Sequence, residues 1–182
     1  MNATGRICIV AALVISTVST TVAGSVLKFV DVVDQAGISF RHARAVFHPK
    51  LNNVMPWLTA GGAGVAIGDY NNDGLDDIYF VSSGHGARNH LYRNDGGFKF
   101  TEVALPAGIS KVNETKETGT SSAALWFDYN DDGWQDMFLL RFGKTALFRN
   151  NKDGTFTEIT REAGVLRHTN ALSVTSIDYD RD

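Results

Sequence analysis

Short apolar runs rich in Val, Ile, Phe and Tyr alternate with Gly, Asn and Asp along most of the chain. In one stretch these runs cover residues 64–69, 77–82, 90–93 and 98–103. Runs of this length, bounded by turn-forming residues, are typical of β-strands. The pattern therefore predicts four short antiparallel strands in this stretch.

Two phrases recur along the chain. An acidic phrase begins at Asp69, Asp128 and Asp178, and a phrase of the form Phe-x-acid-Val/Ile-x-x-x-Ala-Gly-Ile/Val occupies residues 29–38, 100–109 and 156–165. Between them, "NHLYRN" is echoed by "TALFRN". Four strands in a period of roughly 50 residues are typical of a β-propeller blade. We expect a first blade over 64–109, a second over 120–165 and the start of a third over 171–182.

The order of the phrases predicts an incomplete ring. Residues 29–33 carry the last-strand phrase without three strands before it, which suits the strand that closes a propeller. The chain stops in the middle of an acidic phrase. We therefore predict an all-β fold, a partial β-propeller that forms the N-terminal part of a longer, seven-bladed protein.

Residues 1–24 differ from the rest. Arg6 precedes a nine-residue apolar core, and a Ser/Thr-rich stretch leads to small residues near Ala23. This pattern is typical of a secretory signal peptide, and an apolar strand or helix of the fold is the alternative. The only cysteine, Cys8, lies within it, so the mature chain over 25–182 would contain no disulfide. We expect a secreted or periplasmic protein without a membrane span or lipid anchor.

Composition and charge narrow the choice of partners. Hydrophobic residues make up 43% of the chain and charged residues 20%, which is ordinary for a globular protein. The net charge is −3 and the basic residues form no stripe along the sequence, so we expect no nucleic-acid partner.

The acidic phrase has the residue pattern of a calcium loop. Counted from Asp69 or Asp128 as position 1, oxygen-bearing side chains recur at positions 3, 5 and 9, and Gly occupies position 6. Ca²⁺ takes six to eight oxygen ligands, and the carbonyl of position 7 can add one. The predicted ligands are Asp69, Asn71, Asp73, Leu75 and Asp77 in the first loop and Asp128, Asn130, Asp132, Trp134 and Asp136 in the second.

An EF-hand begins in the same way, but it needs a Glu at position 12 and flanking helices. Phe80 and Leu139 occupy that position, and the flanking residues predict strands. The remaining alternative is a hairpin turn in which Asn, Asp and Gly serve only the backbone. Asp76 and Asp131 fall between ligand positions and are expected to be solvated. The third phrase has no Gly and no closing acid, so we expect no ion there.

The phrases "GAGVAIGDYNNDGLDDIYFVSS" and "SSAALWFDYNDDGWQDMFLL", with "NHLYRNDGGFKFTEVALPAGI" and "ALFRNNKDGTFTEITREAGV", resemble the FG-GAP/VCBS repeat family. More narrowly, they are similar to secreted proteins that carry such repeats ahead of an ASPIC/UnbV domain. The resemblance covers residues 29–182 and implies a calcium-stabilised β-propeller. Asn at position 3, where many members have Asp, lowers the charge of the ligand set.

No catalytic constellation is visible among the His and Ser residues. Trp126 is expected in the core and Trp134 over the second loop, and Asn113 begins a glycosylation sequon. Two hypotheses follow. The first is a non-catalytic, calcium-dependent module that binds an extracellular protein or glycan, as in cell adhesion. The second is the propeller portion of a larger secreted enzyme acting on glycans or phosphoesters.

Overall fold

The computed structural model describes residues 28–46, 50, 63–113 and 119–177. The chain divides into two compact units, Met1–Val32 and Val33–Asp182. The predicted signal peptide with Cys8, and the third acidic phrase from Asp178, lie outside the described residues. In the part of the chain that is described, no helix is long and apolar enough to span a membrane.

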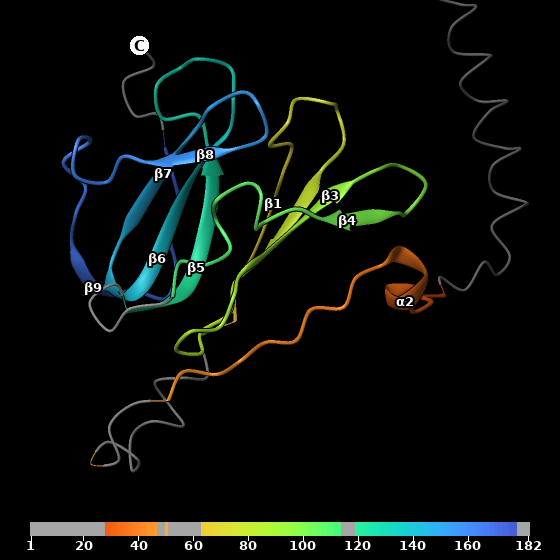
Figure 1. The fold of residues 1–182 in the computed structure, drawn as a ribbon, viewed down its shortest axis with the longest axis horizontal. Coiled ribbons are helices and arrows are strands. Elements are labelled where there is room, and N and C mark those ends of the chain that lie inside the picture. Colours follow the sequence, from red (N-terminus) through yellow and green to blue (C-terminus); the bar gives the residue numbers. More distant parts are fainter. Residues whose placement is uncertain (1–27, 47–49, 51–62, 114–118, 178–182) are drawn as a thin grey trace, which may run out of the picture. The chain divides into compact units, whose positions relative to one another are not determined.

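The first blade is a four-stranded antiparallel sheet in sequence order (Figure 1). Its strands are β1 (Val65–Gly68), β2 (Asp77–Phe80), β3 (His90–Asn94) and β4 (Phe100–Glu102). All four lie within the runs that the hydrophobic pattern predicted or extend one residue beyond them, so these strand predictions are confirmed.

The second blade repeats this order, and its first two strands are longer than those of the first blade. They are β5 (Gly119–Phe127), β6 (Asp136–Lys144), β7 (Ala146–Asn150) and β8 (Phe156–Glu158), and the register of β5 and β6 shifts between Ser121 and Ala123. A further strand, β9 (His168–Asn170), pairs with the end of β6. Two consecutive four-stranded antiparallel sheets confirm the all-β, partial β-propeller fold.

The core lies between the two blades. Tyr79 and Leu91 of the first blade and Met137 and Leu139 of the second are fully buried. Trp126, which is 7% exposed, packs edge-on against Tyr79 at a ring-centroid distance of 6.0 Å. Because side chains alternate between the faces of a strand, each sheet presents one row of these residues to the other blade. The prediction that Trp126 lies in the core is confirmed.

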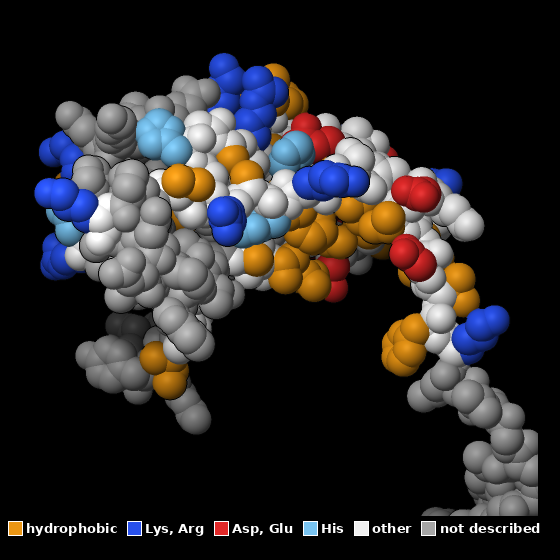
Figure 2. All heavy atoms as spheres, turned by 90° about the horizontal axis from the view of Figure 1, so that it is seen from below, with side chains coloured by type: hydrophobic (Ala, Val, Ile, Leu, Met, Phe, Trp, Pro, Cys, Tyr) orange, Lys and Arg blue, Asp and Glu red, His pale blue; other side chains and the backbone are white. Residues whose placement is uncertain are grey.

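The other face of the first blade is exposed at β1, whereas Phe40 stacks on Phe80 of β2 at a ring-centroid distance of 4.8 Å. Val65 and Ile67 on β1 are 55% and 63% exposed, and Figure 2 shows that hydrophobic side chains gather on one face. Ile67 precedes the first acidic loop as Trp126 precedes the second. Equivalent faces therefore differ in environment: in the second blade this face packs against the first blade, and in the first blade its β1 strand is exposed.

The expected closing strand over 29–33 is not formed. Residues 28–32 have no regular secondary structure, and a short helix, α2 (Val33–Ala36), begins at Val33. Local hydrogen bonds close this turn, from Gly37 N to Asp34 O at 3.3 Å and from Ile38 N to Val33 O at 3.2 Å. A strand needs a neighbouring strand as hydrogen-bond partner, whereas this turn is closed by its own residues.

The same turn follows β4 and β8, at the Ala-Gly end of the repeated phrase. Gly108 N donates to Leu105 O, and Gly164 N donates to Arg161 O. Gly37, Gly108 and Gly164 all have positive φ (78°, 83° and 67°). Glycine adopts this conformation without steric penalty, which explains its place in all three phrases.

The expected first strand of a third blade is absent from residues 171–177, which carry no regular secondary structure. Ser122 Oγ donates to Ala171 O at 2.8 Å, so this segment begins beside β5. A side-chain contact of this kind does not provide the backbone ladder that a strand requires.

Candidate metal centre

The two acidic loops connect the first two strands of each blade and share one backbone conformation. Positions 4 and 6 have positive φ in both: 56° at Asn72, 83° at Gly74, 56° at Asp131 and 81° at Gly133. Asn, Asp and Gly are the residues that tolerate this region best. The repeated sequence therefore encodes a repeated loop.

The position-1 carboxylate organises each loop. Asp69 accepts hydrogen bonds from Asp73 N at 3.1 Å and Gly74 N at 2.8 Å. Asp128 accepts from Asp132 N at 3.1 Å and Gly133 N at 2.7 Å. The carboxylate thus draws the backbone of positions 5 and 6 back towards position 1.

Positions 3 and 5 are joined in the same way in both copies. Asn71 Nδ2 donates to Asp73 Oδ2 at 2.8 Å, and Asn130 Nδ2 donates to Asp132 Oδ2 at 3.0 Å. The other carboxylate oxygen of position 5 accepts the amide of position 7, Leu75 or Trp134. Three predicted ligands of each loop are therefore directly connected.

The position-9 acids are the most buried. Asp77 and Asp136 are both 0% exposed. Asp77 accepts from Tyr70 N at 3.1 Å and Asn94 N at 2.7 Å, and Asp136 accepts from Tyr129 N at 3.1 Å and Asn150 N at 2.7 Å.

Burial, with a smaller contribution from the charges of Asp73 and Asp69, raises the pKa of Asp77 to about 6, against the lowering effect of its two backbone hydrogen bonds. Burial likewise raises the pKa of Asp136. Each is a buried carboxylate beside other carboxylates, and a bound cation would offset the cost of burying their negative charge.

One oxygen in the first loop lacks a partner. Asn71 Oδ1 is buried and accepts no hydrogen bond in the described structure. A buried acceptor without a donor is unfavourable, and a cation satisfies it as well as a donor does. Together with the carboxylate oxygens, it belongs to the all-oxygen ligand set predicted from the sequence, which suits Ca²⁺.

The acidic side chains are turned towards backbone amides, which belong to their own loops and, for the position-9 acids, also to Asn94 and Asn150. Among the described residues, no three His, Cys, Asp or Glu side chains converge as a group that could hold a metal ion. Carboxylate oxygens carry more than one acceptor site, so an amide bond leaves capacity for a cation. Both interpretations of the loops, as turns and as calcium loops, share these hydrogen bonds, and calcium binding stays a prediction.

The two loops differ in how exposed the side chain at position 7 is. Leu75 is 38% exposed, whereas Trp134 is partly buried. Asp76 and Asp131 are exposed, as expected for residues between ligand positions. The carbonyl ligands predicted at Leu75 and Trp134 stay predictions.

A lysine reaches the second loop only. Lys152 Nζ lies 3.2 Å from Asp132 Oδ2, and the equivalent residue of the first blade is Gly96. Desolvation acts to raise the pKa of Asp132, but hydrogen bonds from Asn130 and Lys152 outweigh it and lower the pKa. Sequence reasoning missed this residue because it lies twenty positions beyond Asp132, after the two strands β6 and β7.

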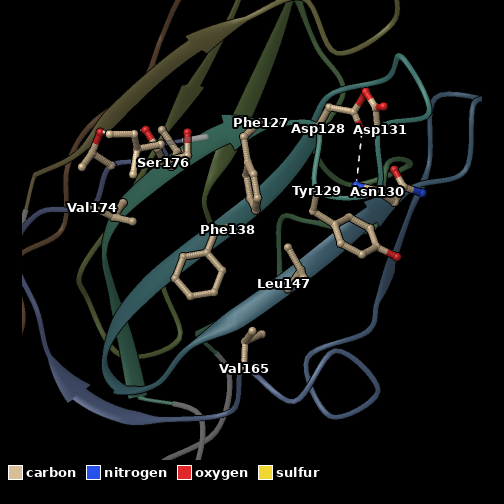
Figure 3. Close-up of a pocket in the computed structure, with 13 residues that line it drawn as sticks. Phe127, Asp128, Tyr129, Asn130, Asp131, Phe138, Leu147, Val165, Val174 and Ser176 are labelled. Atoms are coloured by element: carbon tan, nitrogen blue, oxygen red, sulfur yellow. Dashed lines mark hydrogen bonds between the residues drawn. The ribbon is translucent and has the colours of Figure 1, made fainter. Parts of the chain in front are cut away.

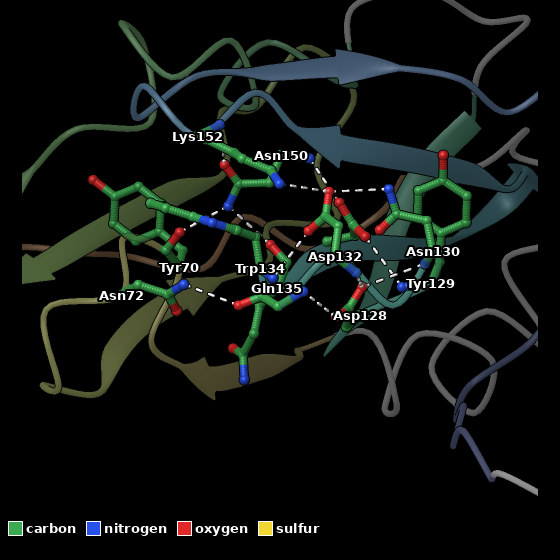
Figure 4. A network of polar contacts seen from close by, with 12 residues as sticks. Tyr70, Asn72, Asp128, Tyr129, Asn130, Asp132, Trp134, Gln135, Asn150 and Lys152 are labelled. Carbon is green, nitrogen blue, oxygen red and sulfur yellow. Dashed lines mark hydrogen bonds and ion pairs between the residues drawn. The ribbon is translucent and has the colours of Figure 1, made fainter. Parts of the chain in front are cut away.

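The two loops are hydrogen-bonded to each other (Figure 4). Asn72 Nδ2 of the first loop donates to Gly133 O of the second at 2.9 Å. Asn150, at the end of β7, donates to Tyr70 O of the first loop at 2.7 Å and to Gln135 O of the second at 3.0 Å. The repeat pattern showed two loops but not that the fold places them side by side.

A groove of about 1030 Å³ lies beside the second loop. Figure 3 shows Phe127, Phe138 and Leu147 along its floor, with Asp128 and Asn130 at its rim. These apolar side chains lie on the face of the second blade that alternates with the core-facing row. One edge of the predicted calcium loop is therefore also the edge of an apolar groove.

A His and a Ser side chain, His42 and Ser83, are in contact. His42 Nε2 lies 3.2 Å from Ser83 Oγ, but that hydroxyl donates to Ser121 O at 2.7 Å and Ser83 is 1% exposed. Its proton is held by a carbonyl, so this pair does not present a nucleophile to solvent.

Asn113, the first residue of the sequon, is 0% exposed. Its amide donates to Ser82 O and Ala87 O, and its oxygen accepts from the Ser121 amide and hydroxyl. An attached glycan would replace one hydrogen of this buried amide and break a bond that it donates to Ser82 O or Ala87 O, and the 0% exposed side chain leaves no room for a sugar.

Two antiparallel four-stranded blades, each with an acidic loop between its first two strands, define a protein of the β-propeller repeat class. The family model described as FG-GAP-like repeat matches residues 128–182. The match begins at the first residue of the second acidic loop and includes β6, β7 and β8, so the second blade is similar to an FG-GAP-like repeat from its acidic loop onwards. No curated protein matches the chain.

Proposed function

We propose that the protein is a calcium-binding β-propeller module in which each acidic loop holds one Ca²⁺. The observation that carries the proposal is the equivalence of the loops. All five predicted side-chain and glycine positions recur, with the same hydrogen bonds and the same positive φ values. A turn requires only some of these residues, whereas an ion requires its oxygen ligands together.

The ion would be held by side-chain oxygens at positions 1, 3, 5 and 9 and by the carbonyl at position 7. The unpaired Oδ1 of Asn71 and the buried carboxylates Asp77 and Asp136 support this assignment. A bound cation stabilises the folded chain by neutralising them and by linking the first two strands of each blade. We expect dissociation constants of about 10⁻⁴–10⁻³ M, as in other extracellular calcium modules.

We further propose that the protein is exported and acts by binding an extracellular protein or glycan without catalysis. The signal-peptide pattern of residues 1–24 supports export, and the resemblance to secreted proteins with an ASPIC/UnbV domain supports a binding role. The apolar groove beside the second loop offers a surface on which calcium and a ligand could meet.

Calorimetric titration of the 182-residue chain with CaCl₂, together with thermal melting with and without EGTA, tests the calcium proposal. We expect about two ions per chain and a higher melting temperature with calcium. Asp77→Asn and Asp136→Asn should each abolish one binding event. Asp76→Asn and Asp131→Asn, which remove exposed charges from the same loops, are the matched controls and should retain both. A folded chain whose melting temperature ignores calcium contradicts the proposal.

A further inference from the structure

The two position-9 acids are linked by a short series of hydrogen bonds. Tyr70 N donates to Asp77 Oδ2 at 3.1 Å, and Tyr70 O accepts from Asn150 Nδ2 at 2.7 Å. Asn150 N in turn donates to Asp136 Oδ1 at 2.7 Å. Three hydrogen bonds through two residues therefore join predicted ligands of different loops.

Asn150 is built into this position. It is 2% exposed, its Oδ1 accepts from Lys152 N at 2.9 Å, and its amide group also donates to Gln135 O. Both amide hydrogens are used, one towards each loop. Buried hydrogen bonds of this kind are costly to leave unmade, so the backbone of the two loops must keep its relative position.

A second link lies at the surface. Asn72 Nδ2 donates to Gly133 O, which joins position 4 of the first loop to position 6 of the second. Asp131, at position 4 of the second loop, has the same φ of 56°. The asparagine thus adds a cross-loop bond at a place where the backbone conformation alone would accept other residues.

The first blade contains the matched comparison. Asn94 repeats the local bonds of Asn150: its N donates to Asp77 Oδ1, its amide to Asp76 O, and its Oδ1 accepts from Gly96 N. The bond to Tyr70 O is the additional one at Asn150. The local role of this asparagine can therefore be separated from its role between loops.

We infer that the two loops bind Ca²⁺ with positive coupling, transmitted by Asn150 and assisted by Asn72. The inference rests on the proposed calcium function. An ion in the first loop fixes Asp77 and with it the Tyr70 backbone, which holds the Asn150 amide that orders Asp136. Ordering one loop therefore lowers the entropy lost when the other binds its ion.

The test uses Trp134 as a reporter, because the second loop has tryptophan where the first has Leu75. Tryptophan emission of the 182-residue chain is followed during CaCl₂ titration, and Trp134→Leu identifies the signal of the second loop. The first loop is disabled with Asp69→Asn and Asp73→Asn. We expect the calcium concentration at half-saturation of the second loop to rise about fivefold or more, within the usual range of coupling.

Asn150→Ala should reduce that shift to less than about twofold, while Asn94→Ala should leave it at about fivefold or more. If Asn150→Ala does not fold, Asn72→Gly, which suits the positive φ, should reduce the shift, and Asp131→Gly should not. Coupling is reciprocal, so Asp132→Asn should weaken the first loop, measured by calorimetry, by the same factor.

Two results would overturn the inference: an unaltered midpoint of the second loop after the first is disabled, or an undiminished shift in folded Asn150→Ala. In either case calcium still binds, and only the coupling fails. A folded chain that takes up no calcium at all would overturn the proposed function, and the coupling with it.

Discussion

At the scale of single residues, the two loops are nearly identical in backbone and predicted ligand set but differ in their neighbours. Lys152 reaches Asp132 in the second loop, and Gly96 occupies the equivalent position beside the first. An ammonium group at a ligand carboxylate competes with a cation for the same charge. A residue outside the motif therefore distinguishes two predicted sites that have the same motif.

Replacing Lys152 with Met should strengthen calcium binding at the second loop by about twofold to fivefold, the range expected for a partly exposed ion pair. Trp134 emission and calorimetry at low salt measure this change. Lys152→Arg, which keeps the charge, should bind as the unaltered chain does. Equal affinities for the Met and Arg variants would show that Lys152 does not compete with the ion.

Asn113 carries a different residue-scale prediction. Asn113→Ala leaves the buried Ser121 amide and hydroxyl without their acceptor, so the free energy of unfolding should fall by about 1–3 kcal/mol. Denaturant unfolding measures the loss. Asn151→Ala, at an exposed asparagine that bonds Thr155, is the control and should change it by about 0.5 kcal/mol or less. Similar losses for both variants would show that the buried hydrogen bonds of Asn113 contribute little to the free energy of unfolding.

At the scale of elements, the contact between β1 and β5 depends on a glycine, Gly64, at a position where a larger side chain would not fit. A Cβ added at Gly64, just before β1, would lie 2.8 Å from Ser122 O and 2.9 Å from Ala123 Cα. Both atoms belong to the backbone of β5, which cannot move aside as a flexible side chain can. Gly64 therefore permits the close approach of the first strands of the two blades.

Gly64→Ala should lower the free energy of unfolding by about 1–3 kcal/mol through overpacking between the blades. Val65→Thr is the control. It replaces an exposed side chain of β1 with one of similar shape and should change the free energy of unfolding only slightly. Chemical denaturation of both variants provides the comparison. An unchanged stability of the alanine variant would mean that β1 and β5 are able to move apart.

The elements also show which part of the repeated phrase is intrinsic. The Ala-Gly turn forms in all three copies, because its hydrogen bonds are local and its glycine supplies the positive φ. The Phe-x-acid strand forms at β4 and β8, where β3 and β7 lie alongside, and not at 29–32. The Ala-Gly part of the repeated phrase therefore forms a turn in every copy, whereas the Phe-x-acid part forms a strand only where another strand lies beside it.

At the scale of the whole molecule, the buried acids make stability depend on pH, with a sign that calcium should reverse. The pKa of Asp77 is about 6 in the folded chain, against an ordinary value of 3.8, and that of Asp136 is also raised. Between pH 3.8 and about pH 6, Asp77 keeps its proton in the folded chain but has released it in the unfolded chain. The free energy of unfolding of the calcium-free protein should therefore fall as pH rises from about 4 to about 6.

With calcium at about 5 mM, above the expected dissociation constants, the trend should reverse, because the ion binds only the deprotonated carboxylates. Thermal melting between pH 4 and pH 7, with and without calcium, measures both trends. Asp77→Asn should flatten the calcium-free profile, and Asp76→Asn should not. A calcium-free profile that rises over this range relative to Asp77→Asn would contradict the buried-acid explanation.

The sequence by itself determined the strands of the first blade, the two loops and the propeller class. These depend on short-range rules, namely alternation along a strand and glycine or asparagine at positive φ, which are visible in adjacent residues. Only the tertiary structure decided that Asn150 reaches Tyr70, eighty residues away, that Asn113 is buried, and that Lys152 contacts Asp132. Such contacts depend on how one blade packs on the next and how turns fold back, and no local pattern specifies these arrangements.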